Sequence, residues 1–209
     1  MNRTRKILAA VSATALVVLS LGFVGCVKTS GGEWYIHSAA LPEDWPELTP
    51  VGEVQVKSYP LYRSAEVSAL SVGSSDSSLF RELFRHISSE DIAMTAPVEM
   101  RYNGDDAGDN SMAAMAFYYR DTSIGSTGTD GNVVVEDIEP QQAATVGVRG
   151  PYSTRNYEKG LTLVRDWLAD NPQWQPDGEP RYLGYNGPFV LWFMRYGEVQ
   201  VPVRETGTQ

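Results

Sequence analysis

The sequence is poor in the residues that build metal and redox sites. Its 209 residues include one cysteine, Cys26, and two histidines, His37 and His86. A single cysteine excludes an intrachain disulfide and a cysteine-based zinc site, and two histidines exclude a site built from several imidazoles. The sequence also has no Gly-x-Ser-x-Gly elbow for a nucleophilic serine. These absences argue against the common catalytic sites, and we expect the protein not to be an enzyme.

Basic charge is scarce as well. Lysine and arginine total 17 against 26 aspartates and glutamates, which gives a formal net charge of -9. Binding to a phosphate backbone needs a basic patch or run, so we expect no nucleic-acid partner. The apolar fraction of 42% and the charged fraction of 21% are those of a globular protein. The chain is therefore expected to form a packed domain.

The first 25 residues have the pattern of a secretory signal peptide. A basic stretch at residues 2–6 precedes the uncharged apolar segment Ile7–Leu21, and small residues lead to Cys26. The stretch Phe23–Cys26 resembles a bacterial lipobox, with phenylalanine in place of the usual leucine. We therefore predict cleavage after residue 25 and lipidation of Cys26, which would anchor an exported domain at the periplasmic side of the outer membrane. An uncleaved membrane helix over Ile7–Val27 is the alternative.

The segment after the signal is expected to be a tether. Residues 26–50 contain a Ser-Gly-Gly turn and three prolines, which interrupt regular structure. The segment also contains Trp34, Tyr35 and Trp45. Such large rings are expected to pack on the domain that follows.

Residues 51–203 contain one pattern twice. Val54 in the first copy corresponds to Val133 in the second, 79 residues later. The strand patterns that recur are Val54–Tyr59, Ala65–Ala69, Val133–Ile138 and Ala144–Val148. In each copy an amphipathic helix and two further strands follow. The pattern predicts an α+β fold, a distorted antiparallel β-barrel built from a duplicated strand-helix-strand-strand unit with two flanking helices, followed by a tail at 204–209.

Two motifs of this domain resemble those of the SOUL haem-binding proteins. Asp91–Val98, which reads DIAMTAPV, resembles the central signature of that family. Tyr185–Phe189 followed by Arg195–Val199 resembles its closing pattern, with Gly197 where asparagine is usual. The resemblance covers about residues 51–203 and implies a flanked β-barrel that binds haem or another tetrapyrrole without catalysis. We expect a monomer.

The resemblance directs attention to the first helix as the haem-binding element. Haem needs an apolar slot, groups that bind its propionates and, in some proteins, an axial iron ligand. His86 is the only histidine of the domain and the candidate axial ligand, while Arg81 and Arg85 lie one turn apart and are candidates for the propionates. The candidate apolar contacts are Leu79, Leu83 and Phe84, on a stripe that also holds Phe80 and Ile87. The alternative is ordinary packing on the sheet, with surface ion pairs and a histidine at a helix end.

Two other functions are open. The duplicated architecture also resembles bacterial effector-binding domains, which bind cationic apolar compounds between their halves against a buried carboxylate. The candidate residues for such a site are Glu99, Glu136, Glu198, Tyr102, Tyr118, Tyr119 and Trp192. A buried glutamate facing the cleft between the halves would favour this function. A filled cleft with an exposed aromatic patch would instead favour an envelope interaction protein without a ligand.

Overall fold

The structure, a computed structural model, describes residues 27–73, 75–103 and 111–207. The predicted signal peptide and Cys26 lie outside the described residues. None of the helices in the described ranges has the length and hydropathy of a membrane-spanning segment.

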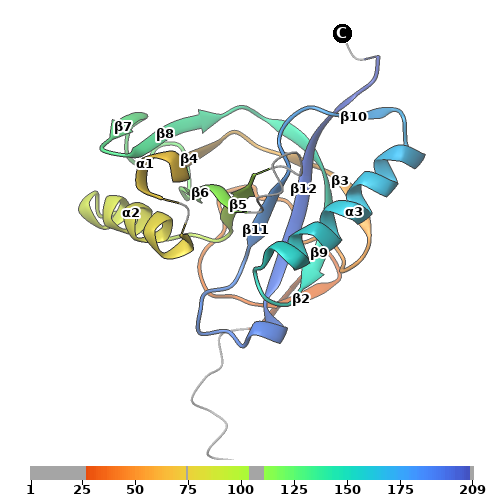
Figure 1. Cartoon of the computed structure of the whole chain (residues 1–209), viewed down its shortest axis with the longest axis horizontal. Coiled ribbons are helices and arrows are strands. Elements are labelled where there is room, and N and C mark those ends of the chain that lie inside the picture. Colours follow the sequence, from red (N-terminus) through yellow and green to blue (C-terminus); the bar gives the residue numbers. More distant parts are fainter. Residues whose placement is uncertain (1–26, 74, 104–110, 208–209) are drawn as a thin grey trace, which may run out of the picture.

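The described chain forms a short hairpin and a large antiparallel sheet with helices packed on it (Figure 1). The hairpin consists of β1 (Val27–Ser30) and β2 (Glu33–Ile36). The sheet strands are β3 (Val54–Tyr59), β4 (Tyr62–Ser68), β5 (Val98–Tyr102), β6 (Met112–Tyr118), β7 (Gly128–Asp130), β8 (Val133–Ile138), β9 (Gln141–Arg149), β10 (Trp174–Pro176), β11 (Arg181–Gly184) and β12 (Tyr196–Glu205). The helices are α1 (Ala69–Val72), α2 (Asp76–Ser89), α3 (Thr154–Asp170) and the 3-10 helix η2 (Trp192–Met194).

The ten-stranded sheet is open. Its strands lie in the order β3-β9-β12-β11-β5-β6-β4-β8-β7, and β10 pairs with β12. Among the described residues no pairing joins β3 to β7, so the predicted closure into a barrel is wrong. The predicted α+β class and antiparallel pairing are confirmed. Alternating sequence patterns report which face of a strand is buried, but they carry no information on whether the two edge strands meet.

Strands from the two halves of the chain are interleaved in this sheet. β3 pairs with β9, β4 pairs with β8, and β5 pairs with β11. Each of these pairs joins a strand from before residue 103 to one from after residue 132. Neither half therefore completes the sheet by itself.

One face of the sheet is covered by the two long helices. Ser75 is the N-cap of α2, and its side chain accepts a hydrogen bond from the amide of Ser78. Leu79 and Leu83 of α2 and Val164 of α3 are fully buried in the same apolar core. Because side chains alternate along a strand, the odd-numbered valines of β12 face this core.

The other face is covered by the segment that the sequence predicts to be a tether. Among the described strands β1 pairs only with β2 and is largely exposed, whereas residues 35–48 of this segment pack against the sheet. Tyr35 and Leu48 are buried, and Trp45 packs on the same cluster, as predicted for the large rings. Trp34 is more exposed, but the guanidinium of Arg149 lies 3.8 Å from the centre of its ring. A polar and aromatic sheet face is thereby closed off from solvent.

Candidate functional site

The structure separates the six residues that the sequence groups around haem. Leu79 and Leu83 are fully buried in contact with the sheet, so a ligand outside the helix does not reach them. Phe84 is 49% exposed on the outer side of α2. Arg81 is exposed on α2, and Arg85 is paired with Glu82. The predicted apolar set is thus divided between the core and the surface.

His86 lies at the end of α2 with both ring nitrogens engaged. Nδ1 is 2.7 Å from Oδ2 of Asp130, and Nε2 is 2.8 Å from the hydroxyl of Tyr119. These partners come from β7 and from the residue after β6, so they hold the buried ring between helix and sheet. A pocket of ≈ 240 Å³ lies beside the ring and is lined mainly by residues 125–130. It is smaller than the roughly 300–1,000 Å³ typical of small-molecule sites, and an iron bound by His86 would have to displace one partner.

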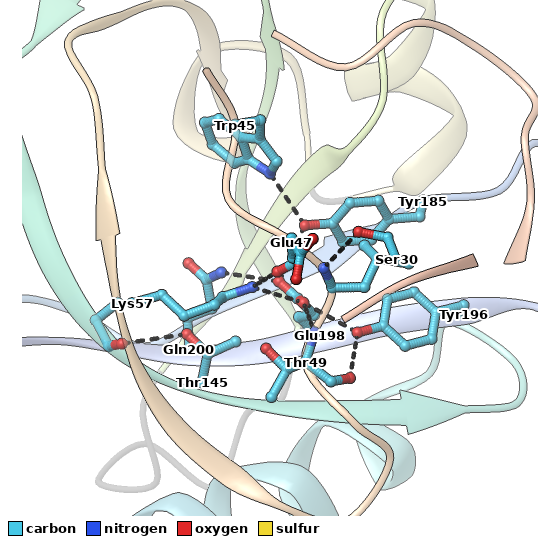
Figure 2. A network of polar contacts seen from close by, with 12 residues as sticks. Ser30, Trp45, Glu47, Thr49, Lys57, Thr145, Tyr185, Tyr196, Glu198 and Gln200 are labelled. Atoms are coloured by element: carbon cyan, nitrogen blue, oxygen red, sulfur yellow. Dashed lines mark hydrogen bonds and ion pairs between the residues drawn. The ribbon is translucent and has the colours of Figure 1, made fainter. Parts of the chain in front are cut away.

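The most elaborate constellation lies on the opposite, tyrosine-rich face of the sheet (Figure 2). Glu198 of β12 lies at the centre of this constellation and is 0% exposed. Its Oε1 is 2.8 Å from Nζ of Lys57 on β3. The amide of Thr49 donates to Oε1 at 2.8 Å, and the hydroxyl of Tyr196 donates to it at 2.9 Å. The hydroxyl of Tyr185 donates to Oε2 at 2.9 Å. Both carboxylate oxygens are therefore saturated by donors of this chain.

The electrostatics of this network favour an ionised carboxylate. Burial opposes ionisation of Glu198, but the Lys57 ammonium and the hydrogen bonds outweigh it and hold the pKa of Glu198 below its ordinary value. Burial and the neighbouring carboxylate raise the pKa values of Tyr185 and Tyr196, so both phenols remain protonated donors. The result is a buried, neutralised ion pair with hydrogen-bond donors around it.

A second buried carboxylate lies on the same face. Glu99 of β5 accepts a hydrogen bond from the hydroxyl of Tyr118. Its Oε2 is 3.5 Å from Nη1 of Arg181, and its Oε1 is 3.3 Å from Nε of Arg101. Arg181 also donates from Nε to the side chain of Gln200 at 3.0 Å, which links Glu99 to the Glu198 network. Both buried carboxylates thus have internal cations.

Trp45 closes this face from the outside. Its ring lies 4.9 Å from that of Tyr59, 5.4 Å from that of Tyr62 and 5.2 Å from that of Tyr118, measured between centroids. Its indole nitrogen donates to the hydroxyl of Tyr185 at 3.1 Å (Figure 2). The space between the two halves is filled here by the chain itself.

The sequence indicates part of this constellation. Glu99 and Glu198 are among the candidate carboxylates and are buried here, whereas Glu136 is exposed. Sequence reasoning does not single out Lys57 and Trp45 as site residues. The signal available for Lys57 is its place on the same side of its strand as Tyr59, on a face that also buries tyrosines of other strands.

The fold has relatives among solved structures. The EcmrR C-terminal domain matches with a TM-score of 0.53 and 18% identity, over 73% of this chain and 98% of that chain. EcmrR in a complex with DNA matches with a TM-score of 0.52 and 19% identity, over 73% of this chain and 57% of that chain. A hydrolase from Listeria innocua matches with a TM-score of 0.54 and 10% identity, over 75% of this chain and 94% of that chain. At these identities the likeness concerns the fold alone.

The family of the chain follows from its sequence. No curated protein matches it. A family model described as "SOUL heme-binding protein" matches residues 46–202, which includes both sheet faces and the two long helices. The match spans most of the chain, and the protein belongs to the SOUL heme-binding protein family.

Proposed function

We propose that the protein is a non-catalytic haem- or tetrapyrrole-binding carrier, buffer or sensor, held at the cell envelope by a lipid on Cys26. Membership of a heme-binding family supports the ligand class. The basic, apolar and small-residue pattern of residues 1–26 supports export and anchoring. Without β7 and β10, the strand order is β3-β9-β12-β11-β5-β6-β4-β8. Exchanging β3, β4, β5 and β6 with β8, β9, β11 and β12 gives the same order read from the other edge of the sheet. This symmetry supports the duplicated unit.

The observation that carries the binding proposal is a pair of stacked rings on α2, in which Phe84 is exposed and Phe80 packs on the core. Phe80 and Phe84 stack with their ring centroids 6.0 Å apart and their planes within 12° of parallel. Phe84 is half exposed, so its ring offers a flat apolar surface to a flat ligand. Arg81 and Arg85 lie on the same stretch of helix surface, because residues three and four apart are neighbours there. Arg81 supplies a guanidinium group for one propionate, and Arg85 supplies one for the other by exchanging its partner Glu82 for the ligand.

Binding on this face needs no iron ligand. Phe84 points outward, whereas His86 is buried and bonded to Asp130 and Tyr119. A ring held by stacking and by its propionates would bind with or without iron. Ligation by His86 would require Tyr119 to release Nε2, and the spectrum of bound haem distinguishes the two arrangements.

The test is a titration of the full chain in detergent with haem and with iron-free protoporphyrin IX, followed by Soret absorbance. We expect saturable one-to-one binding of both. Phe84→Ala should weaken it by up to about tenfold, the size of one aromatic contact of about 0.5–1.5 kcal/mol. Leu61→Ala, which removes an exposed apolar side chain elsewhere, is the matched control. His86→Ala should leave the spectrum unchanged, and loss of its Soret shift would instead assign the iron to His86. Absence of saturable binding to either ligand would refute the proposal.

One observation favours a second candidate, a binding module for cationic apolar compounds. Glu198 and Glu99 are buried among tyrosines, as such a site requires. Lys57 and Arg181 occupy the cation positions, however, and Trp45 fills the space above them. We therefore expect a fluorescent lipophilic cation such as ethidium not to bind the unmodified chain. Saturable binding of ethidium that Glu198→Gln abolishes would favour this function over the first.

A further inference from the structure

The loop between β11 and β12 exposes a run of large apolar side chains. Phe189 is 86% exposed, Leu191 58%, Trp192 61% and Phe193 54%. These four residues and their neighbours, residues 186–195, form the aromatic loop. Arg195 is its only charged residue. Closely spaced exposed apolar side chains of this size mark a surface that contacts something other than water.

The backbone of the aromatic loop is fixed by hydrogen bonds. Arg195 donates from Nε to the carbonyl of Val190 and from Nη2 to that of Pro188, both at 2.9 Å. The amide of Asn186 donates to the hydroxyl of Tyr152 at 2.7 Å. The only cation of the loop therefore serves its own carbonyls. The apolar side chains are presented on a preformed scaffold, which lowers the entropic cost of binding.

The base of this loop contacts the point where the described chain begins. Val27 pairs with Ile36 at the open end of the β1–β2 hairpin. The side chain of Asn186 donates a hydrogen bond to the carbonyl of Ile36. Val27 and Trp34 are themselves exposed, so the hairpin adds two apolar side chains beside the loop. Figure 1 shows the hairpin and η2 at the same end of the molecule.

Arg149 ties the same hairpin to the loop a second time. Its guanidinium stacks on the ring of Trp34, forms an ion pair with Glu33 at 2.9 Å and donates to the carbonyl of Met194 at 3.4 Å. The hairpin and the aromatic loop are thus parts of one surface.

We propose that this surface docks on a lipid bilayer, with the aromatic loop inserted at the membrane interface. Cys26 directly precedes Val27, a separation of about 3.8 Å between Cα atoms, so a lipid on Cys26 brings this end of the domain to the membrane. Tryptophan and phenylalanine are side chains that interfacial segments bury at the boundary between headgroups and acyl chains. The inference rests on the envelope anchoring in the proposed function and is independent of haem binding.

Charge identifies the driving force of docking. The chain from Cys26 onward has 14 basic and 26 acidic residues and a formal net charge of -12, and the loop adds no free cation. Attraction to anionic lipid therefore contributes little, and apolar burial supplies the contact. Insertion should accordingly be insensitive to salt.

The test measures the depth of Trp192 in the bilayer. The processed chain, lipidated on Cys26, is reconstituted into vesicles of phosphatidylethanolamine and phosphatidylglycerol with brominated acyl chains, which quench nearby tryptophan fluorescence. We expect quenching that persists at high salt and falls in Trp192→Leu, with the remainder due to Trp34 on the hairpin. The control is Trp174→Leu, because Trp174 pairs with Glu205 at the opposite end of the ten-residue β12 and should lie far from the lipid. Unchanged thermal unfolding confirms that both variants fold.

Three results would overturn the inference. A chain that floats with the vesicles but shows no quenching through Trp192 would be anchored without docking. A chain that does not float with the vesicles would refute the anchoring on which the inference rests, while the haem titration would stand by itself. A dimer in lipid-free detergent that Trp192→Leu dissociates would assign the surface to a second copy of the chain.

Discussion

Lys57 and Glu198 form a buried ion pair whose two members depend on each other. In Glu198→Gln the ammonium of Lys57, with a side chain 8% exposed, keeps its burial but loses its counter-charge. We expect the free energy of unfolding to fall by about 3–5 kcal/mol, as measured by urea denaturation. The control is Asp177→Asn, which breaks the exposed pair with Arg204 at 3.8 Å and should cost less than about 1 kcal/mol. Equal effects of the two substitutions would contradict this account.

The same carboxylate predicts a pH dependence. The pKa of Glu198 lies below its ordinary value of 4.5 in the folded chain, because Lys57 and the hydrogen bonds outweigh the effect of burial. The unfolded chain therefore takes up this proton at a higher pH than the folded one. The stabilisation is complete above pH 4.5 and is lost as the pH falls through the folded-state pKa. Urea denaturation should show that the difference in free energy of unfolding between wild type and Glu198→Gln becomes smaller below pH 4.5. A difference that stays constant with pH would contradict the lowered pKa of Glu198.

At this scale the sequence predicts residue types better than residue partners. A glutamate among alternating apolar residues marks Glu198 as a candidate, and it is buried. Nothing near His86 in the sequence indicates that Tyr119 and Asp130, 33 and 44 residues away, engage its nitrogens. Partners of this kind depend on strand order, which local patterns do not contain.

Among the elements, α3 packs closely against the sheet at Gly160, where a larger side chain would not fit. A Cβ at this position would come within 2.5 Å of a methyl carbon of Val199 on β12. Such overpacking costs about 1–3 kcal/mol, and helix propensity returns at most about 1 kcal/mol of it. Thermal unfolding of Gly160→Ala should therefore occur at a lower temperature, and adding Val199→Ala should restore part of the loss.

Gly187→Ala is the control for this substitution. A Cβ added at Gly187 would meet no other atom within 4 Å, and the backbone there needs no positive φ. The unfolding temperature of this variant should not change. An equal loss in both variants would show that crowding against β12 is not the cause.

The strands with clear alternation are the predictable elements. Val54–Tyr59 and Val133–Ile138 are strands with the predicted bounds, because a half-buried strand imposes period two on its side chains. The hairpin at residues 27–36 is not predictable in this way and lies in the segment expected to be a tether. Its strands have four residues each, too few for a pattern, and only the Gly31–Gly32 turn between them is a local signal.

For the whole molecule, we predict that residues 27–50 are needed for stability. They supply Trp45, the amide of Thr49 that binds Glu198, and the carbonyl of Glu47 that binds Lys57. Loss of a buried leucine side chain such as that of Leu48 alone costs about 2–5 kcal/mol, a large share of the stability of a domain. A chain starting at residue 51 should lose cooperative thermal unfolding, whereas one starting at residue 27 should keep it. Equal unfolding temperatures would mean that the segment is a dispensable cover.

The architecture is predictable in class but not in closure. Two copies of a pattern with helices between strands indicate α+β, and the sheet with its two long helices agrees. Whether ten strands close into a barrel depends on strand tilt and stagger, which are set by the packing of both faces. One of these faces is covered by the tyrosine-rich cluster and residues 35–48. These contacts join residues far apart in the sequence, so local patterns do not predict them.

The position of β12 has a consequence for how the molecule is made. This strand follows every other described element in the sequence, yet it pairs with β9, β10 and β11 inside the sheet and contributes Glu198. Until it has been synthesised, β9 and β11 have unpaired edges and Lys57 has no counter-charge. The described sheet therefore cannot be completed before residues 196–205 have been synthesised, since domains fold as units and non-local strand pairing is slow.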